Sequence, residues 1–446
     1  MNTNTLTCQI LEFLDNLPIY DVHTHLIGGK LGATGLHDLL LYHMVISELY
    51  AAGCPSGNRL TQFPAFPDEG EATHRIQEAI PYLPYIQNTS TSWLLRKIFS
   101  DLYDWHEPIT TDNWQQLDRR IRQQASQPGW AYSVLDRAKI LRSGTELARR
   151  GNGEDDDRLM YSLEWAFFTR CQWGEYDTAL YELERCWGRK PESPSPIGGK
   201  HRPPTERTIR SLDDVHEAVQ YYVDTIPFAQ VVSLATHIST DIDYKNVSAK
   251  EMELALKKRQ NATIIERDIY ASYVNECFLE KLEAHAGETV FQFSLGAEPL
   301  PYETASRISQ RTISQLAEMI ARHPTIQFQV FLSSRHANQS LCTLARELPN
   351  LALVGYWWHN FFPDIIQQVM GERLDMLPVN RQIGFFSDAY CVEWSYAKSQ
   401  LVRLLLARAL AQRVEYGQYD LKTAKWIAEQ ILVISPATLL HMRPHR

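Results

Sequence analysis

Two histidines one residue apart are the residues best suited to chemistry in this 446-residue chain. His23 and His25 stand in the stretch IYDVHTHLIGG, at the end of a short apolar run. Because side chains at positions i and i+2 of a strand point to the same face, both imidazoles can reach one metal ion. Two partly exposed surface histidines would give the same pattern, so the pair alone leaves both interpretations open.

Other apolar runs also end in polar residues. Asp388 follows QIGFFS, and a carboxylate there suits a third metal ligand or a general base. The competing interpretation is an N-cap for the helix expected near Glu393. His237 and His359 close the runs VVSLATH and LALVGYWWH. His237 is the better ligand candidate because neutral imidazole suits zinc and other transition metals, although a hydrogen-bonded structural role remains the alternative for both.

The elements that must position these residues follow from the apolar pattern. Residues 5 to 15 predict an amphipathic helix, and a short strand should follow it up to His23. After residue 225, runs rich in Val, Phe and Ile alternate with helices; they cover 228–237, 289–299, 325–334, 351–360 and 382–390. This alternation predicts a parallel sheet buried on both faces. An α/β fold of the (β/α)8 TIM-type barrel class is the leading prediction, with a doubly wound sheet as the alternative.

The chain divides into three predicted parts. Residues 1–34 hold the N-terminal helix and the first barrel strand, 35–150 form a mainly helical insertion, and 151–446 supply the remainder of the barrel. Residues 186–206 are rich in Pro, Gly, Ser and basic residues and predict a loop. This loop is either a lid over the site or a solvated connection.

Composition limits the classes of protein and partner. The chain is 44% hydrophobic with a formal net charge of −9, which favours a globular protein and argues against a nucleic-acid binder. The seven cysteines include no C-x-x-C pair, so reduced thiols in the cytoplasm are expected. We find no signal peptide and no run near the ~18 apolar residues of a membrane span. The abundant aromatic residues would suit a homo-oligomer interface.

Several motifs resemble a known family. YDVHTHL resembles the first-strand metal motif of the amidohydrolase superfamily, and GFFSDA resembles its last strand. The similarity extends to the uronate isomerase branch through YHMVISELYAAG, NTSTSW, the glutamine-bearing sixth strand FQFSLGAEP, the Trp-Trp strand VGYWWHN and the helix AKSQLVRLLLARALAQ. The segment from about 105 to 220 carries no such motif.

The resemblance implies a (β/α)8 barrel with a helical insertion and a divalent metal, usually zinc. It implies that His23 and His25 are metal ligands, that Asp388 is both ligand and proton carrier, and that His43 is an active-site histidine. The implied reaction interconverts an aldose uronate and its ketose form. A metal can polarise the oxygens while a carboxylate moves the proton between C2 and C1.

The chain departs from the uronate isomerase pattern at residues that would handle protons or bind the substrate carboxylate. Where the branch has Asp and Tyr on either side of the active-site histidine and Arg later in that helix, this chain has Tyr42, Met44 and Ser47. The branch's Arg at the last strand is Tyr390, and the sixth-strand histidine common in the wider superfamily is Ser294. The predicted substrate contacts are therefore Arg335, His359, Trp358 and Tyr390. For Arg335 and the adjacent His336, a solvated loop is the alternative.

The leading functional prediction is a uronate isomerase-like enzyme whose partner is a small-molecule sugar acid. The first alternative is a metal-dependent hydrolase or decarboxylase, in which Asp388 would take a proton from water. The second is a noncatalytic homologue, because a fold alone does not determine function.

Overall fold

Eight parallel strands form one sheet whose spatial order follows the chain from β1 to β8. The structure is a computed structural model that describes residues 3–55, 68–151, 156–164, 178–188, 207–238, 244–296, 308–358 and 361–442. The strands are β1 Ile19–Asp21, β2 Ile140–Glu146, β3 Leu159–Glu164, β4 Val231–Ile238, β5 Val290–Leu295, β6 Phe328–Leu332, β7 Leu351–Val354 and β8 Gln382–Ile383.

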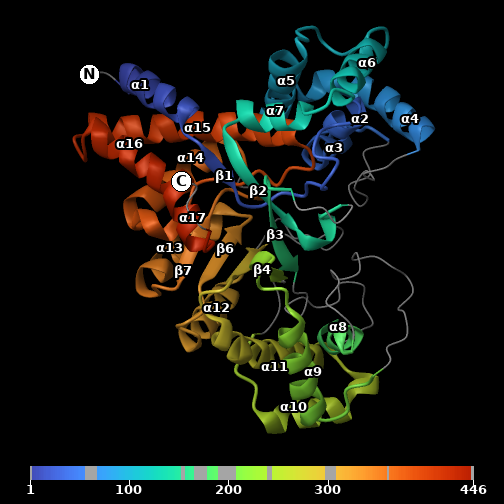
Figure 1. Cartoon of the computed structure of the whole chain (residues 1–446), viewed down its shortest axis with the longest axis vertical. Coiled ribbons are helices and arrows are strands. Elements are labelled where there is room, and N and C mark those ends of the chain that lie inside the picture. Colours follow the sequence, from blue (N-terminus) through green and yellow to red (C-terminus); the bar gives the residue numbers. More distant parts are fainter. Residues whose placement is uncertain are drawn as a thin grey trace.

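Helices cover this sheet and alternate with its later strands (Figure 1). They are α1 Thr3–Asn16, α2 Leu36–Leu40, α3 His43–Ala51, α4 Glu69–Ala79, α5 Ser90–Tyr103, α6 Trp114–Ala125, α7 Trp130–Arg137, α8 Thr178–Cys186, α9 Leu212–Thr225, α10 Ala249–Lys257, α11 Ile264–Leu282, α12 Gln310–Arg322, α13 Asn338–Glu347, α14 Pro363–Met376, α15 Val392–Glu415, α16 Leu421–Glu429 and α17 Ser435–Leu439. None of the described helices is long and apolar enough to cross a membrane.

The segments that follow the first and last strands lie side by side. The amide of Asp388 donates to the carbonyl of His23 at 3.0 Å, and the amide of His25 donates to the carbonyl of Ala389 at 2.8 Å. These bonds join the two edges of the curled sheet at the carboxyl ends of its strands. The predicted (β/α)8 barrel class is thereby confirmed, and residues from opposite ends of the chain meet at the barrel mouth.

The helices α2 to α7 separate β1 from β2 and gather at one end of the molecule (Figure 1). The strand β2 begins at Ile140, inside the range 35–150 that the sequence predicts to be mainly helical. Its residues ILRSGTE alternate little between apolar and polar types, which explains why the pattern did not reveal a strand. The barrel therefore resumes before residue 151.

One later strand differs in number from the order that the resemblance implied. The run FQFSL belongs to β5, not to a sixth strand. The predicted last strand is also shorter than its apolar run, because only Gln382–Ile383 makes ladder bonds. The rest of QIGFFSDAY is irregular backbone, which frees Ser387 and Asp388 for other contacts.

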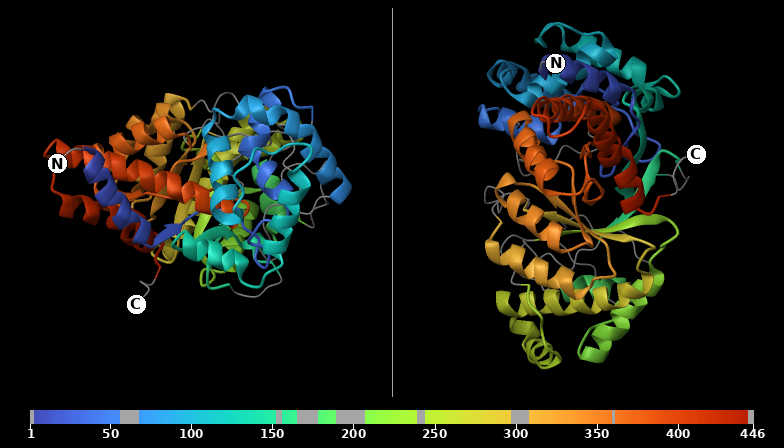
Figure 2. Two further views of the ribbon diagram at one scale, coloured as in Figure 1. Left: turned by 90° about the horizontal axis from the view of Figure 1, so that it is seen from above. Right: turned by 90° about the vertical axis from the view of Figure 1, so that its left-hand side faces the viewer.

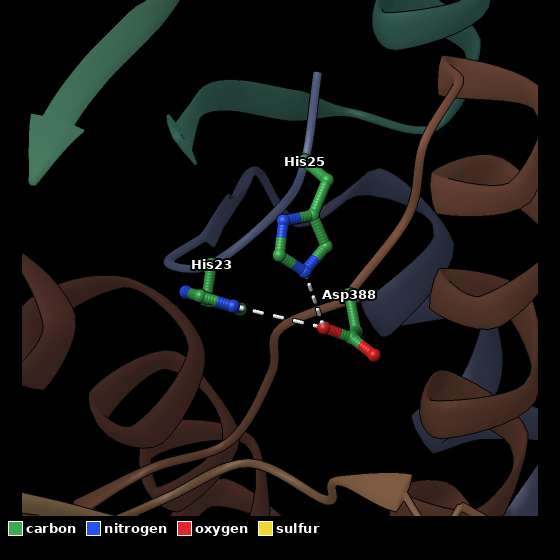
Figure 3. Close-up of side chains that lie close together, drawn as sticks. All are labelled: His23, His25 and Asp388. Atoms are coloured by element: carbon green, nitrogen blue, oxygen red, sulfur yellow. Dashed lines mark ion pairs between the residues drawn. The ribbon is translucent and has the colours of Figure 1, made fainter. Parts of the chain in front are cut away.

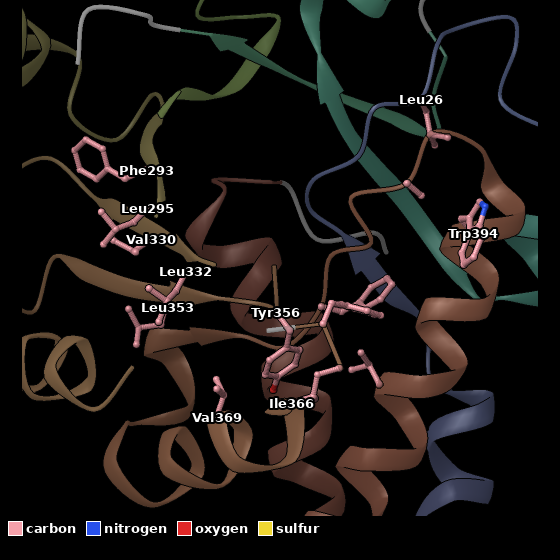
Figure 4. Close-up of a cluster of buried hydrophobic side chains, with 14 of the residues drawn as sticks. Leu26, Phe293, Leu295, Val330, Leu332, Leu353, Tyr356, Ile366, Val369 and Trp394 are labelled. Atoms are coloured by element: carbon pink, nitrogen blue, oxygen red, sulfur yellow. The ribbon is translucent and has the colours of Figure 1, made fainter. Parts of the chain in front are cut away.

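The core lies between the sheet and its helices. Figure 4 shows Phe293, Leu295, Val330, Leu332 and Leu353, which come from neighbouring strands and are fully buried. Burial of apolar surface of this kind contributes about 25 cal/mol per Å². The barrel is therefore a packed scaffold that fixes where each strand ends.

The N-terminal helix α1 packs against the long helix α15, which follows the last strand. As predicted, α1 is amphipathic and buries Leu6, Ile10 and Leu14; it packs along α15 (Figure 2). The buried Arg403 of α15 donates to the carbonyls of Leu14 and Ala138, and so links α15 to both neighbouring segments. This packing holds the segment after β8 against the segment after β1.

Candidate metal and active site

Three side chains that could hold a metal ion meet at the barrel mouth. His23 and His25 follow β1, and Asp388 follows β8. The Oδ1 atom of Asp388 lies 3.6 Å from Nε2 of His23 and 3.3 Å from Nε2 of His25 (Figure 3). The three donor atoms lie within 4.8 Å of one another. In TIM-barrel enzymes, the catalytic residues lie at the carboxyl ends of the strands.

This donor set fits a divalent transition metal. Two imidazole nitrogens and a carboxylate oxygen are ligands that zinc accepts. Ligand atoms about 2.0–2.2 Å from a tetrahedral ion lie roughly 3.4 Å apart. The measured separations of 3.3 and 3.6 Å are close to that spacing. An ion would therefore need little rearrangement of Asp388 relative to either histidine.

Asp388 does not cap a helix, so the competing interpretation was wrong. The helix α15 begins at Val392 and its N-cap residue is Cys391. Asp388 has a left-handed backbone, with φ of 56°, a conformation that is uncommon for residues other than glycine. Backbone strain of this kind persists when surrounding bonds fix it. Here the amide of Asp388 is bonded to His23, and its carbonyl accepts from the hydroxyl of Tyr42 at 3.0 Å.

The charges of this cluster are coupled. Burial opposes ionisation of Asp388, but the hydrogen bond from His25 and the nearby imidazoles hold its pKa well below the usual range. Burial also opposes protonation of His25, yet its hydrogen bonds to Asp388 and Glu146 raise its pKa to about 9. In the absence of metal, a protonated His25 therefore supplies the positive charge that Asp388 requires.

His43 faces the other oxygen of the same carboxylate. It is the first residue of α3, and its Nε2 lies 3.8 Å from Oδ2 of Asp388. Its ring stacks on Trp358, with centroids 5.3 Å apart. Burial lowers the pKa of His43 to about 3, so its imidazole is neutral at pH 7. The sequence-predicted catalytic pair, His43 and Asp388, is thus brought together.

Two of the predicted substrate contacts line the same site. Trp358 stacks on His43, and Tyr390 stacks on His25 with centroids 4.7 Å apart. Arg335 is exposed and donates to Oε1 of Gln368 on α14 at 2.5 Å, which agrees with the solvated-loop interpretation. Aromatic rings, not Arg335, therefore form the described wall beside the histidines.

Three predictions fall outside what the structure describes. His237 is the penultimate residue of β4 and pairs with Ser294 of β5, but its side chain is not among the described parts. His359 lies outside the described residues, and so does most of the predicted 186–206 loop.

Two glutamates that sequence reasoning missed close neighbouring strands. Glu146 is the last residue of β2, and its Oε1 lies 3.0 Å from Nδ1 of His25. Glu164 is the last residue of β3; burial raises its pKa to about 7, and the charge of Glu146 adds to that rise. Glu146 is the last residue of the strand ILRSGTE, and Glu164 is the last residue of the strand LMYSLE. Asp388 likewise stands at the end of an apolar run. Recognition of those strands would have identified them.

A buried lysine holds the backbone next to Asp388. Lys398 of α15 donates to the hydroxyl of Tyr42 and to the carbonyl of Ser387, both at 2.7 Å. Burial lowers its pKa to about 8. Ser387 in turn donates its amide and hydroxyl to the buried carboxylate of Asp21, at 2.7 and 2.6 Å. These bonds fix the backbone on which Asp388 stands.

The fold of this chain is that of solved uronate isomerases. A uronate isomerase from Bacillus halodurans is 18% identical, with a TM-score of 0.71 over 100% of this chain and 98% of that one. A glucuronate isomerase from Caulobacter crescentus is 15% identical, with a TM-score of 0.78 over 99% and 95%. A Lactobacillus casei protein, assigned provisionally as a metal-dependent hydrolase, is 12% identical, with a TM-score of 0.55 over 97% of each chain. No family model and no curated protein matches the sequence.

Proposed function

We propose that this chain is a metal-dependent isomerase that converts an aldose uronate, a small sugar acid, into its ketose form. The observation that carries the proposal is the His23, His25 and Asp388 cluster at the mouth of the barrel. The full-length fold similarity to uronate isomerases supports it. Because two ligands are imidazoles, zinc is the proposed ion.

The two oxygens of Asp388 suit different tasks. A divalent ion held by His23, His25 and Asp388 would supply the positive charge that polarises the substrate oxygens. Oδ1 faces the two metal-binding imidazoles, whereas Oδ2 faces His43. An ionised carboxylate can take the proton from C2 and return it to C1, and a neutral His43 can exchange a proton with a substrate oxygen. The conversion neither consumes nor releases water.

A metal-dependent hydrolase or decarboxylase is the second candidate. The Lactobacillus casei similarity favours it, and so does the presence of Tyr390 and Ser47 where the resemblance to uronate isomerases implies arginines. In that reaction, Asp388 would accept the proton of a water molecule. A noncatalytic role is less well supported, because it does not explain why Asp388 keeps a left-handed backbone beside two histidines.

One experiment separates these candidates. Zinc-loaded protein is incubated with glucuronate or galacturonate, and the products are followed by NMR and mass spectrometry. A ketose with the molecular formula of the substrate is the expected product, and Asp388→Asn should lower its rate at least about 100-fold, the lower range for a general acid–base group. A product that has lost carbon dioxide would support the decarboxylase form of the second candidate. No turnover by the zinc-loaded protein would contradict the proposal.

A further inference from the structure

We infer that Glu146 is a positioning residue that holds the ring of His25 so that its Nε2 faces the metal site. The inference rests on the metal site proposed above and adds a contact that the three-residue cluster does not contain. Glu146 lies on the far side of His25 from Asp388. Its Oε1 is 3.0 Å from Nδ1 of His25, whereas Oδ1 of Asp388 is 3.3 Å from Nε2. The two carboxylates thus face the two ring nitrogens.

The backbone places Glu146 opposite His25. The amide of Thr24 donates to the carbonyl of Gly144 at 2.6 Å, and the hydroxyl of Thr145 donates to the carbonyl of Leu26 at 2.8 Å. A Cβ atom on Gly144 would lie 2.3 Å from the carbonyl oxygen of Val22, so only glycine permits this close approach. The register between β2 and the segment after β1 is therefore fixed on both sides of His25.

The carboxylate of Glu146 is itself held in place. Its Oε2 forms an ion pair with Nε of Arg149 at 3.3 Å, and Nη1 of Arg149 lies 3.4 Å from the carbonyl oxygen of His25. Arg149 ends the 3-10 turn Leu147–Arg149 that follows β2. With one oxygen on Arg149, the other is aimed at the ring of His25.

The chemical consequence concerns the tautomer of His25. An ionised carboxylate only accepts hydrogen bonds, so the hydrogen must lie on Nδ1. The lone pair available to an ion is then on Nε2, the nitrogen that faces Asp388. Carboxylates that bind the second nitrogen of a metal-ligating histidine also fix the ring orientation, and their loss typically weakens metal binding about 10–100-fold.

The test measures zinc affinity by competition with a chromophoric chelator, using full-length protein whose folding is checked by circular dichroism. Glu146→Ala should bind zinc about 10–100-fold more weakly than the unaltered protein. Glu146→Gln should lie between the two, because its amide oxygen still accepts from Nδ1. Glu12→Gln is the control, since it removes an exposed carboxylate on α1 and leaves the His25 contact intact. Its affinity should change by less than about 3-fold, which is smaller than the effect of losing an orienting carboxylate.

Cobalt substitution gives a readout that a merely structural role would not move. In the Co²⁺ protein, the hydrogen on Nδ1 of a metal-bound His25 should give a shifted, exchangeable proton signal. Glu146→Ala should lose that signal through exchange with water, and Glu12→Gln should keep it.

Two results would overturn the inference. Glu146→Ala could bind zinc as tightly as the unaltered protein, which would leave Glu146 without a positioning role. Alternatively, Glu146→Gln could abolish binding as fully as His25→Ala does, which would make Glu146 a direct ligand. If the unaltered protein bound no zinc, the proposed metal site itself would fail, and that outcome is distinguishable from both.

Discussion

The ammonium group of Lys398 donates to the hydroxyl of Tyr42 at 2.7 Å, in a place where both side chains are buried. The same hydroxyl donates to the backbone carbonyl of Asp388 at 3.0 Å, so Tyr42 connects Lys398 to Asp388. The aromatic ring of Tyr42 also stacks on Trp394, with centroids 4.4 Å apart. Asp388, a candidate metal ligand that follows the last strand, is therefore held in place by Tyr42, which comes between β1 and β2 in the sequence.

Replacement of Tyr42 by Phe should destabilise the protein while keeping the ring stack. The change removes a buried hydrogen bond to Asp388 and one partner of Lys398, so a loss of about 1–3 kcal/mol in the free energy of unfolding is expected. Urea denaturation of metal-free protein measures it. Tyr50→Phe, at a residue that is 49% exposed, serves as the control and should shift stability by less than about 0.5 kcal/mol. Equal effects of both substitutions would contradict the supporting role of Tyr42.

The double substitution His23→Ala, His25→Ala should remove bound metal. It eliminates both imidazole donors of the cluster. Elemental analysis of purified protein should then show less than about a tenth of the original metal, since one remaining carboxylate does not make a zinc site. His336→Ala, an exposed histidine in the turn after β6, should leave the metal content unchanged. Retention of metal by the double variant would refute the site.

Zinc binding should release protons and weaken as the pH falls. The hydrogen bonds to Asp388 and Glu146 outweigh burial and raise the pKa of His25 to about 9, so metal-free protein carries a proton there at pH 7. An ion must displace that proton. Titration with zinc in weakly buffered solution at pH 7 should release about one proton per ion, and affinity should be lower at pH 6 than at pH 8. Binding that does not change over this range would contradict the assignment of His25.

A second cluster, remote from the metal site, predicts how stability depends on pH. Glu276 of α11 contacts Arg322 at 2.8 Å and His323 at 3.3 Å. Burial would raise the pKa of Glu276, but these two contacts lower it to about 2. Because the folded pKa is depressed, the stabilisation is present above the unfolded pKa of about 4.3 and is lost as the pH falls toward 2.

His323 titrates in the opposite sense. Burial would lower its pKa, but Glu276 and Glu283 raise it above the ordinary value. Its stabilisation is therefore complete below the unfolded pKa of about 6.5 and is lost as the pH rises through the folded pKa.

Glu276→Gln should consequently lower the free energy of unfolding by about 1–3 kcal/mol at pH 6. The cost should fall toward pH 9, as His323 loses its proton, and it should also be smaller at pH 3, where the native carboxylate begins to protonate. Urea denaturation at the three pH values measures these differences. Glu288→Gln, at an exposed residue after α11, is the matched control and should show little change at any of them. A penalty for Glu276→Gln that is the same at all three values would contradict this account.

The sequence was most informative where an apolar run ended in an unusual polar residue. His23, His25 and Asp388 could be assigned to one site because parallel strands bring their carboxyl ends together. The barrel and the helical insertion followed from the alternation of apolar runs with helices. Glu146 could not be found in the same way, since β2 contains Arg, Ser and Thr and does not resemble a buried strand. Glu164 was missed because β3, the short run LMYSLE, was not recognised as a strand.

Contacts that depend on packing were also beyond the sequence. Lys398 lies in a helix whose residues are buried on most sides, so no amphipathic pattern indicates which face it presents. Its two hydrogen bonds arise because α15 packs against the segment after β1. The exposure of Arg335, similarly, depends on the turn that precedes α13 and not on the residue type.

The hydrogen bonds between the His23–His25 segment and the Asp388–Ala389 segment also have a consequence for the order of folding. The candidate ligands follow the first and last barrel strands, so the cluster forms only once both of these strands are in place. An ion bound there would link the first and last strands of the folded barrel. Because it binds only the folded state, the free energy of unfolding would rise with the zinc concentration. Zinc would thus stabilise only those chains in which the first and last barrel strands have come together.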